Sequence, residues 1–209
     1  MHVIDLKIID IEKKFADRRP GVVGDYRNYS IFVPLIKKDG KVNLLFEVRS
    51  PGLERQPGEV CFPGGRAEDG EEAGECALRE TCEELGLQRV AIRMIARLDT
   101  IYTYNSLALY PFLGEINEKM FDADGINKKE VESVFYVPLA DFVNCEPYSY
   151  KAEVRPDVRD DFPYEMIDCP EGYDWSRGIY EVLIYRFGDK AIWGITARIA
   201  HSLAMILKG

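Results

Sequence analysis

Three glutamates near the middle of the chain, Glu80, Glu83 and Glu84, are spaced so that their carboxylates can act together. In a helix, at about 100° per residue, these positions share one face, and Leu78 and Leu85 fall roughly opposite. Like charges this close repel one another, and they lie near the helix C-terminus, where anions are disfavoured. A divalent cation bridging the carboxylates would offset that cost, and it could hold a phosphate oxygen and a nucleophilic water together.

An acidic helix face is more often only a solvated surface, because glutamate is a good helix former. The neighbouring residues favour the chemical interpretation here. Gly64 and Gly65 follow Pro63 in a tight turn whose backbone carbonyls could face a ligand. Glu71 lies near the expected helix start, where an anion is favoured, and Arg79 lies beside the acidic face and could orient it.

The stretch from residue 65 to residue 87 resembles the signature motif of the Nudix hydrolases. That pattern is Gly-x5-Glu-x7-Arg-Glu-U-x-Glu-Glu-x-Gly-U, where U is usually a bulky aliphatic residue. Every fixed position of the pattern is matched, and Thr81 is the one soft departure, at a U position. The matching residues are Gly65, Glu71, Arg79, Glu80, Glu83, Glu84, Gly86 and Leu87.

The resemblance implies an α/β fold, a Nudix-type α/β/α sandwich with a mixed β-sheet and a loop–helix–loop catalytic motif. It also implies a Mg²⁺- or Mn²⁺-dependent hydrolase that cleaves a phosphoanhydride in a nucleoside-diphosphate-linked substrate. Glu80, Glu83 and Glu84 would be metal ligands, joined by the backbone carbonyl of Gly64. Glu83 and Glu84 would also take part in catalysis, and Arg79 would support them.

The general base in such enzymes often lies outside the motif, on a later loop, and we expect Glu130 to fill this role. Glu130 precedes the strand expected at 131–137, and a carboxylate beside metal ions could accept a proton from bound water. Glu132, Glu115 and a helix glutamate such as Glu83 are alternatives. A solvated loop glutamate with no catalytic role is the simpler interpretation of Glu130.

A second resemblance concerns the substrate. The segment LLFEVRSPGLERQPGEVCFPGG, residues 44–65, is similar to the additional motif of coenzyme A (CoA) diphosphatases, a Nudix subgroup. It implies cleavage of CoA or a CoA derivative to 3′,5′-ADP and 4′-phosphopantetheine or its acyl form. The segment departs from that motif at Phe46, where threonine is usual, and at Glu54, where arginine is usual; the adjacent Arg55 could substitute for that arginine. Arg49, Arg55 and Arg66 are the expected substrate-binding cations.

Other functions compete with this assignment. ADP-ribose, a dinucleotide or a nucleoside triphosphate would be cleaved by the same chemistry. A non-catalytic Nudix-fold module that binds a ligand or regulates a partner is an alternative of another class, and the intact motif argues against it. An acidic partner-binding domain is a third alternative, which would show no dependence on metal.

Hydrophobic periodicity predicts the elements that must position these residues. We expect one domain over residues 1–209, with an N-terminal helix at 3–15 and a linker that ends at residue 24. Residues 144–176 are rich in proline and are expected to form a long loop-rich excursion with little regular structure. The expected strands are 31–36, 42–49, 90–98, 107–116, 131–137 and 179–187, and the first two are expected to form a hairpin. Further helices are expected at 73–85, with Gly86 as its C-terminal cap, and at 193–207.

Composition narrows the classes of partner. The net charge of −9 argues against broad nucleic-acid binding, and no apolar run approaches the roughly 20 residues that span a bilayer. Five cysteines without a Cys-x-x-Cys pair, together with two histidines, disfavour a structural zinc site. The N-terminus does not resemble a signal peptide, so we expect a cytoplasmic protein. The expected partner is a small nucleotide, and a homodimer is one option for the assembly.

Overall fold

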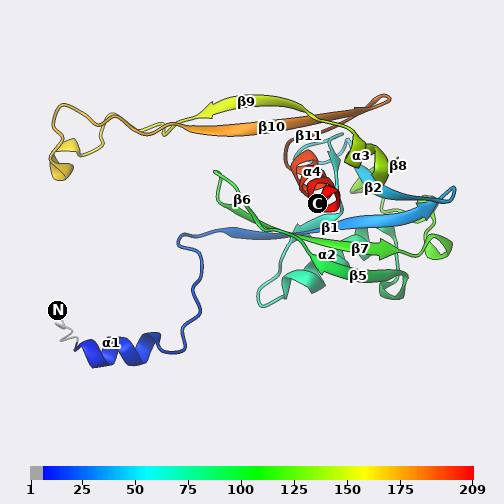
Figure 1. Cartoon of the computed structure of the whole chain (residues 1–209), viewed down its shortest axis with the longest axis horizontal. Helices are drawn as coiled ribbons and strands as arrows, with labels where there is room; N and C mark the ends of the chain where they lie inside the picture. Colours follow the sequence, from blue (N-terminus) through cyan, green and yellow to red (C-terminus); the bar gives the residue numbers. More distant parts are fainter. Residues whose placement is uncertain (1–6) are drawn as a thin grey trace.

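The structure, a computed structural model, describes residues 7–209. Its main sheet has eight strands, with β1 (Arg27–Lys38) between β2 (Lys41–Arg49) and β7 (Leu107–Ile116) (Figure 1). β1 and β7 are parallel and the other pairs are antiparallel, so the sheet is mixed. Its other strands are β3 (Val60–Cys61), β4 (Gly64–Arg66), β5 (Ile92–Arg97), β6 (Ile101–Tyr102) and β8 (Val131–Pro138). The helices are α1 (Ile8–Phe15), α2 (Ala73–Leu85), α3 (Leu139–Asn144) and α4 (Gly194–Lys208).

The hairpin between β1 and β2 is confirmed. Asp39 and Gly40 form its two-residue turn, with φ angles of 52° and 73°, and Lys38 pairs with Lys41. Two successive positive φ angles are typical of a turn whose twist matches the two strands it joins. The turn sets the register of β2, and that register decides which β2 side chains face α2.

Helices cover both faces of the main sheet, so the predicted mixed-sheet sandwich is confirmed. On one face, Leu45 of β2 packs in a cluster with Leu78 and Leu85 of α2. On the other face, Leu44 and Phe46 of β2 pack in a cluster that includes residues of α4. Adjacent residues of a strand point to opposite faces, and apolar burial on both sides holds the layers together.

A second, three-stranded sheet covers the outer side of α4 (Figure 1). Tyr185 and Ile192 of this sheet are buried in the same cluster as Leu203 of α4. Tyr185 is also hydrogen-bonded to His201 of α4, with 2.7 Å between the hydroxyl and Nδ1. The strands of this sheet are β9 (Tyr148–Val154), β10 (Gly178–Phe187) and β11 (Lys190–Trp193).

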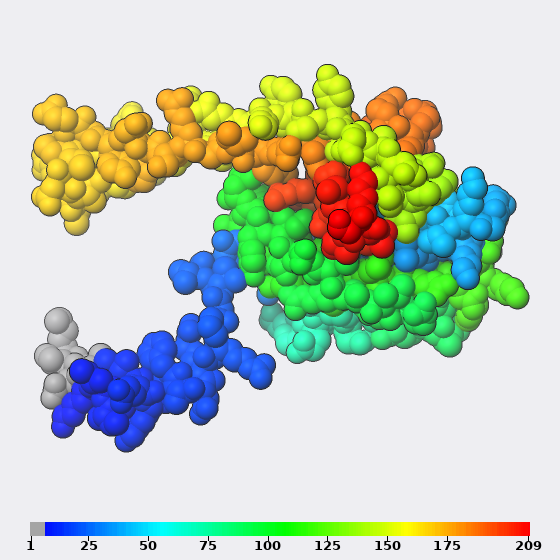
Figure 2. All heavy atoms as spheres, in the orientation of Figure 1, coloured from blue at the N-terminus to red at the C-terminus, as the bar shows by residue number. Residues whose placement is uncertain are grey.

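The expectation of little regular structure in residues 144–176 is wrong for β9. This strand pairs with β10 from Tyr148 opposite Ile184 to Val154 opposite Gly178. The two strands form a hairpin arm that projects from the body, with residues 155–177 at its far end (Figures 1 and 2). Most β9 side chains are exposed, so the strand lacks the alternation of buried and exposed residues that reveals a half-buried strand.

The N-terminal helix is confirmed from Ile8 to Phe15, and the first part of the predicted helix, residues 3–6, lies outside the described residues. None of its residues is buried, and the helix projects on the same side of the body as the arm (Figure 2). Among the helices of residues 7–209, none is long and apolar enough to cross a membrane.

Several short elements were not expected from the sequence. Strands β3 and β4 lie inside a segment that reads as loop, and α3 directly follows β8. Each is only two to six residues long, too short to show a hydrophobic period. β3 and β4 matter for the site, because they place the glycine turn between β1 and α2.

Candidate active site

Helix α2 carries the Nudix-like glutamates and ends at a required glycine. Gly86 adopts the left-handed conformation, with φ 64°, and its backbone N–H donates to the carbonyl of Cys82. A Cβ atom at Gly86 would overlap the carbonyl oxygen of Gly125, so this position also needs the space. The predicted C-terminal cap is therefore confirmed, and it fixes the end of the acidic helix face.

A glycine turn holds the innermost glutamate. The backbone N–H of Gly64 donates to Oε2 of Glu84 at 2.8 Å, and the Glu84 residue is 5% exposed. Gly64 has a φ of 152°, and a Cβ atom there would overlap the carbonyl oxygen of Ser30 on β1. The sequence suggested a role for the carbonyl of Gly64, and the structure adds its amide as a partner of the helix.

The three α2 glutamates lie at graded depth. The side chain of Glu83 is 57% exposed and that of Glu80 is 17% exposed, whereas Glu84 is buried. The carboxylate of Glu80 lies directly against Gly65, where a Cβ atom would overlap it. The lack of a side chain at Gly64 therefore allows the turn to approach the backbone of β1, and at Gly65 it leaves the space that the Glu80 carboxylate occupies.

Arg79 links the loop before α2 to the acidic face. Its Nε and Nη2 donate to the two carboxylate oxygens of Glu71 at 2.8 and 3.0 Å. Its Nη1 lies 2.8 Å from Oε1 of Glu80 and 3.5 Å from Oε2 of Glu83. The hydrogen bonds from Arg79 lower the pKa of Glu71 to about 2. A planar guanidinium suits this two-oxygen contact in a way that lysine does not.

Burial dominates the electrostatics of the inner glutamates. It raises the pKa of Glu84 to about 8, against the opposing hydrogen bond from Gly64, and the charges of Glu80 and Glu130 raise it further. Burial also raises the pKa of Glu80, although Arg79 opposes the shift. A bound divalent cation would favour the ionised carboxylates instead.

The structure brings Glu130 to the same place. Glu130 directly precedes β8, where its backbone carbonyl accepts a hydrogen bond of 2.8 Å from the amide of Ser50. Its Oε1 accepts a hydrogen bond of 3.2 Å from the side-chain amide of Asn127. The backbone N–H of Asn127 donates to the backbone carbonyl of Glu84 at 2.9 Å, so this loop is fixed to the end of α2.

The three arginines expected to bind substrate differ in setting. Arg49, on β2, is half-buried and its Nη2 lies 3.4 Å from the carbonyl of Arg55. Arg55 and Arg66 are exposed, and neither forms an ion pair with another residue of the described chain. The carbonyl of Arg66 accepts a hydrogen bond of 3.5 Å from Arg79, which places this arginine beside the acidic face.

One buried acid was missed by the sequence reasoning. Glu47 of β2 is 1% exposed, and its Oε1 has no hydrogen-bond partner among the described residues. The signal in the sequence was a glutamate inside an otherwise apolar strand segment, where a side chain facing inward is expected to be apolar.

The donors at this site suit a hard divalent cation. Within residues 7–209, no three histidine, cysteine or acidic side chains are already gathered around a common point that could hold a metal ion. In this arrangement Arg79 engages Glu80 and the amide of Gly64 engages Glu84. The donors are nevertheless carboxylate and carbonyl oxygens, which Mg²⁺ and Mn²⁺ prefer, and Oε1 of buried Glu47 lacks a hydrogen-bond partner among the described residues.

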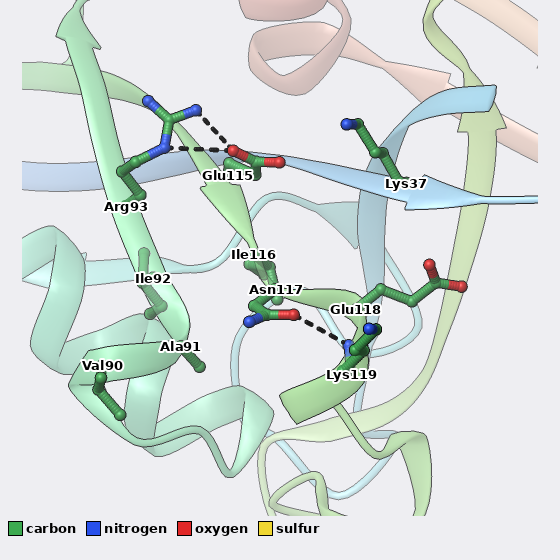
Figure 3. A pocket seen from close by; sticks show the side chains of 10 residues that line it. All are labelled: Lys37, Val90, Ala91, Ile92, Arg93, Glu115, Ile116, Asn117, Glu118 and Lys119. Carbon is green, nitrogen blue, oxygen red and sulfur yellow. Dashed lines mark hydrogen bonds and ion pairs between the residues drawn. The ribbon is translucent and has the colours of Figure 1, made fainter. Parts of the chain in front are cut away.

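A surface hollow of about 440 Å³ lies elsewhere in the molecule, against β5 and the end of β7 (Figure 3). Glu115 lies there, and its Oε2 accepts a hydrogen bond of 3.2 Å from Nε of Arg93. On β1 the partner of Glu115 is Leu35, whereas the partner of Gly64 is Ile31, roughly 13 Å away along the strand. Glu115 is therefore distant from the glycine turn.

Comparison with known proteins places the motif in its family. Residues 26–158, more than half of the chain, match the model of the NUDIX domain. The chain belongs to the Nudix family. The MutT/nudix family protein of Enterococcus faecalis has a similar structure, with a TM-score of 0.50, 12% identity, and coverage of 97% of this chain and 70% of that one. At this identity the likeness shows the Nudix fold alone.

Two relatives of this Nudix protein carry more specific names. The peroxisomal coenzyme A diphosphatase of Mus musculus is 33% identical over 181 residues, which are 86% of this chain and 70% of the relative. The mitochondrial coenzyme A diphosphatase of Mus musculus is 28% identical, over 85% of this chain and 77% of the relative. The chain spans about half the length of several further relatives that it matches.

Proposed function

We propose that this Nudix protein is a Mg²⁺- or Mn²⁺-dependent hydrolase that cleaves the diphosphate of CoA or a CoA derivative. The products would be 3′,5′-ADP and 4′-phosphopantetheine or its acyl form. The observation that carries the proposal is the contact between Gly64 and Glu84. The contact joins the acidic face of α2 to the glycine turn, which ends the segment that resembles the CoA diphosphatase motif. Two relatives that match most of this chain are named coenzyme A diphosphatases.

The metal ligands in this proposal come from both sides of that contact. They are Glu80, Glu83 and Glu84 of α2 and the backbone carbonyl of Gly64. A bound divalent cation would supply positive charge to the diphosphate and make a bound water more acidic. The side chains that would hold it are graded in depth, so the exposed Glu83 lies on the substrate side.

Protein groups would then move the proton and hold the geometry. Glu130 is the proposed general base, because Asn127 fixes its carboxylate and its charge acts on Glu80 and Glu84. Glu83 and Glu84 are alternative proton acceptors on the helix. Arg79 is a positioning residue, since it orients the acidic face through Glu80.

The substrate phosphates would be bound by Arg49, Arg55 and Arg66. Arg66 directly follows the glycine turn and Arg55 lies in the loop between β2 and β3; both are exposed and free of ion pairs among the described residues, so their donors are available to a phosphate. Arg49 contacts the backbone of the loop that carries Arg55. Binding an anion to a chain of net charge −9 requires such local cations in addition to the metal.

Product analysis tests the proposed activity directly. The purified chain would be incubated with CoA, ADP-ribose, NADH and a nucleoside triphosphate, with Mg²⁺ and with chelator, and the products separated by chromatography. We expect Mg²⁺-dependent release of 3′,5′-ADP from CoA. Preferential turnover of another substrate would reject CoA as the substrate. Absence of any metal-dependent turnover would reject the proposed enzymatic activity.

We also propose that the chain acts as one catalytic domain and pairs with a second copy through its arm. β9 is an edge strand with exposed Tyr148 and Tyr150, and edge strands readily pair with another chain. Residues 153–177 of the arm carry eight acidic and three basic side chains, whereas residues 7–19 carry five basic and three acidic ones. The arm of one copy therefore complements the helical segment of another in charge.

Light scattering would test this assembly, with the double variant Tyr148→Asp and Tyr150→Asp as the comparison. We expect a dimer for the parent chain and a monomer for the variant, because a row of new charges on β9 opposes pairing. A monomeric parent at micromolar concentration would reject the proposed dimer.

The proposed compartment is the cytoplasm. Two relatives are named for the peroxisome and the mitochondrion, so these are the compartments to distinguish from it. Imaging of the tagged chain beside markers for both organelles would do so, and co-localisation with either marker would reject the cytoplasmic assignment.

A further inference from the structure

The side chains of β2 alternate between the two faces of the main sheet. Leu44 and Phe46 pack in the cluster that contains α4, and Leu45 packs in the cluster that contains α2. Glu47 and Arg49 follow Leu45 at intervals of two residues, so they point to the same face as Leu45. Glu47 is thus directed from the sheet toward the helix that carries the metal-site glutamates.

Glu47 is buried without adequate partners. It is 1% exposed, and its Oε1 has no hydrogen-bond partner among the described residues. Among the described residues, the one hydrogen-bond donor to its Oε2 is the thiol of Cys61, with 3.9 Å between the oxygen and Sγ, and a thiol is a weak donor. A buried carboxyl group in this state is unfavourable, and an apolar side chain would pack in the strand without that cost.

The groups that face Glu47 leave the site short of positive charge. The charges of Glu84, on α2, and of Glu130, in the loop before β8, act on Glu47, and the thiol of Cys61, on β3, lies beside it. Arg49 is the one cation among the charged groups that act on Glu47, and its Nη2 lies against the carbonyl of Arg55 instead. Nε of Arg49 is itself buried without a hydrogen-bond partner in the described chain. The charged groups that act on Glu47 are therefore two further carboxyl groups and one guanidinium, and that guanidinium is itself only partly hydrogen-bonded.

We propose that Glu47 is a further ligand of the divalent cation, contributed by the sheet rather than by the Nudix helix. The inference rests on the proposed function only in assuming that such a cation binds between α2 and the glycine turn. An ion there would give Oε1 of Glu47 the partner it lacks, and it would supply the positive charge that the facing carboxylates require. The burial of Glu47 in a strand makes this oxygen rigid, which suits the strict geometry of Mg²⁺.

The test is metal affinity, measured without nucleotide. Mn²⁺ would be titrated into the full chain and the free ion followed by electron paramagnetic resonance. We expect Glu47→Gln to weaken Mn²⁺ binding by at least roughly 10- to 100-fold, the range typical for loss of an outer-shell partner of a metal site. The matched control is Glu115→Gln, the same substitution on β7 of the same sheet but distant from the glycine turn, which should bind Mn²⁺ like the parent.

One result would overturn the inference, and a second variant covers the case in which the first does not fold. If Glu47→Gln is folded by circular dichroism and binds Mn²⁺ as tightly as the parent, Glu47 is not a ligand. If that variant does not fold, Glu47→Leu serves the same comparison, because it replaces the buried carboxyl with an apolar side chain of similar size.

The outcome is independent of the substrate. Mn²⁺ binding that depends on Glu47, in a chain that releases no product from CoA, would support the ligand role while rejecting the proposed substrate. If the chain releases 3′,5′-ADP from CoA but Glu47→Gln leaves its Mn²⁺ affinity unchanged, the proposed substrate is supported and the ligand role of Glu47 is rejected.

Discussion

The backbone N–H of Gly64 and the carboxylate of Glu84 are joined by a hydrogen bond of 2.8 Å, although the residues are 20 positions apart. This contact fixes the distance between the glycine turn and α2. It also defines which oxygen of Glu84 is engaged by protein and which is left for a ligand.

Replacement of Glu84 by glutamine should nearly abolish hydrolysis. Glutamine can still accept the hydrogen bond from Gly64, but it removes the negative charge proposed to bind the metal. We expect kcat/KM for CoA to fall by more than about 100-fold, because a direct ligand should matter more than an outer-shell partner. Glu75→Gln is the control, since Glu75 lies on the same helix but is exposed and pairs with Arg89 at 3.3 Å. Equal loss in both variants would contradict the assignment.

The metal-free protein should lose stability as the pH rises from about 4.5 to about 8. Burial raises the pKa of Glu84 from its ordinary value of 4.5 to about 8, so in this range the folded chain binds a proton that the unfolded chain has released. The stabilisation is therefore complete below pH 4.5 and is lost as the pH passes through 8. Glu47, whose pKa burial also raises, acts in the same direction.

Urea midpoints measured in chelator across this pH range would check that slope. Glu84→Gln should flatten it in part, and Mg²⁺ added at pH 8 should raise the midpoint of the parent chain, because a ligand that binds only the folded state stabilises it. A midpoint that rises with pH in chelator would contradict the expected sign.

Substitution of Gly64 by alanine should destabilise the protein more than the same change at Gly70. Both glycines have positive φ angles, 152° and 80°, which cost a side chain about 1 kcal/mol or more. At Gly64 the new methyl group would also overlap the carbonyl of Ser30, which adds about 1–3 kcal/mol, whereas Gly70 faces open space. Free energies of unfolding from urea titrations would compare the two, and equal costs would show that the close approach at Gly64 is relieved.

Arg55→Ala should weaken the binding of CoA more than that of dephospho-CoA. Arg55 is exposed, and it neighbours Glu54, where CoA diphosphatases usually have arginine. If Arg55 contacts the 3′-phosphate, its loss should raise KM for CoA by about 10-fold, since a charge-assisted hydrogen bond contributes about 1.5–3 kcal/mol. Steady-state kinetics on both substrates would measure this. An equal rise in both KM values would place Arg55 at the diphosphate instead.

Most regular elements could be predicted from the sequence, because their apolar residues follow a clear period. Helix α2 and its end at Gly86 were expected from the spacing of Leu78 and Leu85 and from the glycine itself. Strand β9 was not, because the arm has no buried face and its prolines and charges resemble a loop. The exposure of β9 side chains, which removed the hydrophobic period from its sequence, also leaves this edge strand accessible to another chain.

The sequence alone determined the family, through the motif at residues 65–87. It also determined the acidic face of α2, because helix periodicity is local and places Glu80, Glu83 and Glu84 on one side of the helix. Only the tertiary structure decided the depth of each carboxylate, the engagement of Glu84 by Gly64, and the approach of Glu47. These depend on strand register and on contacts between segments far apart in the sequence. A shift of one residue in β2 would turn Glu47 to the opposite face of the sheet, and no local pattern specifies that register by itself.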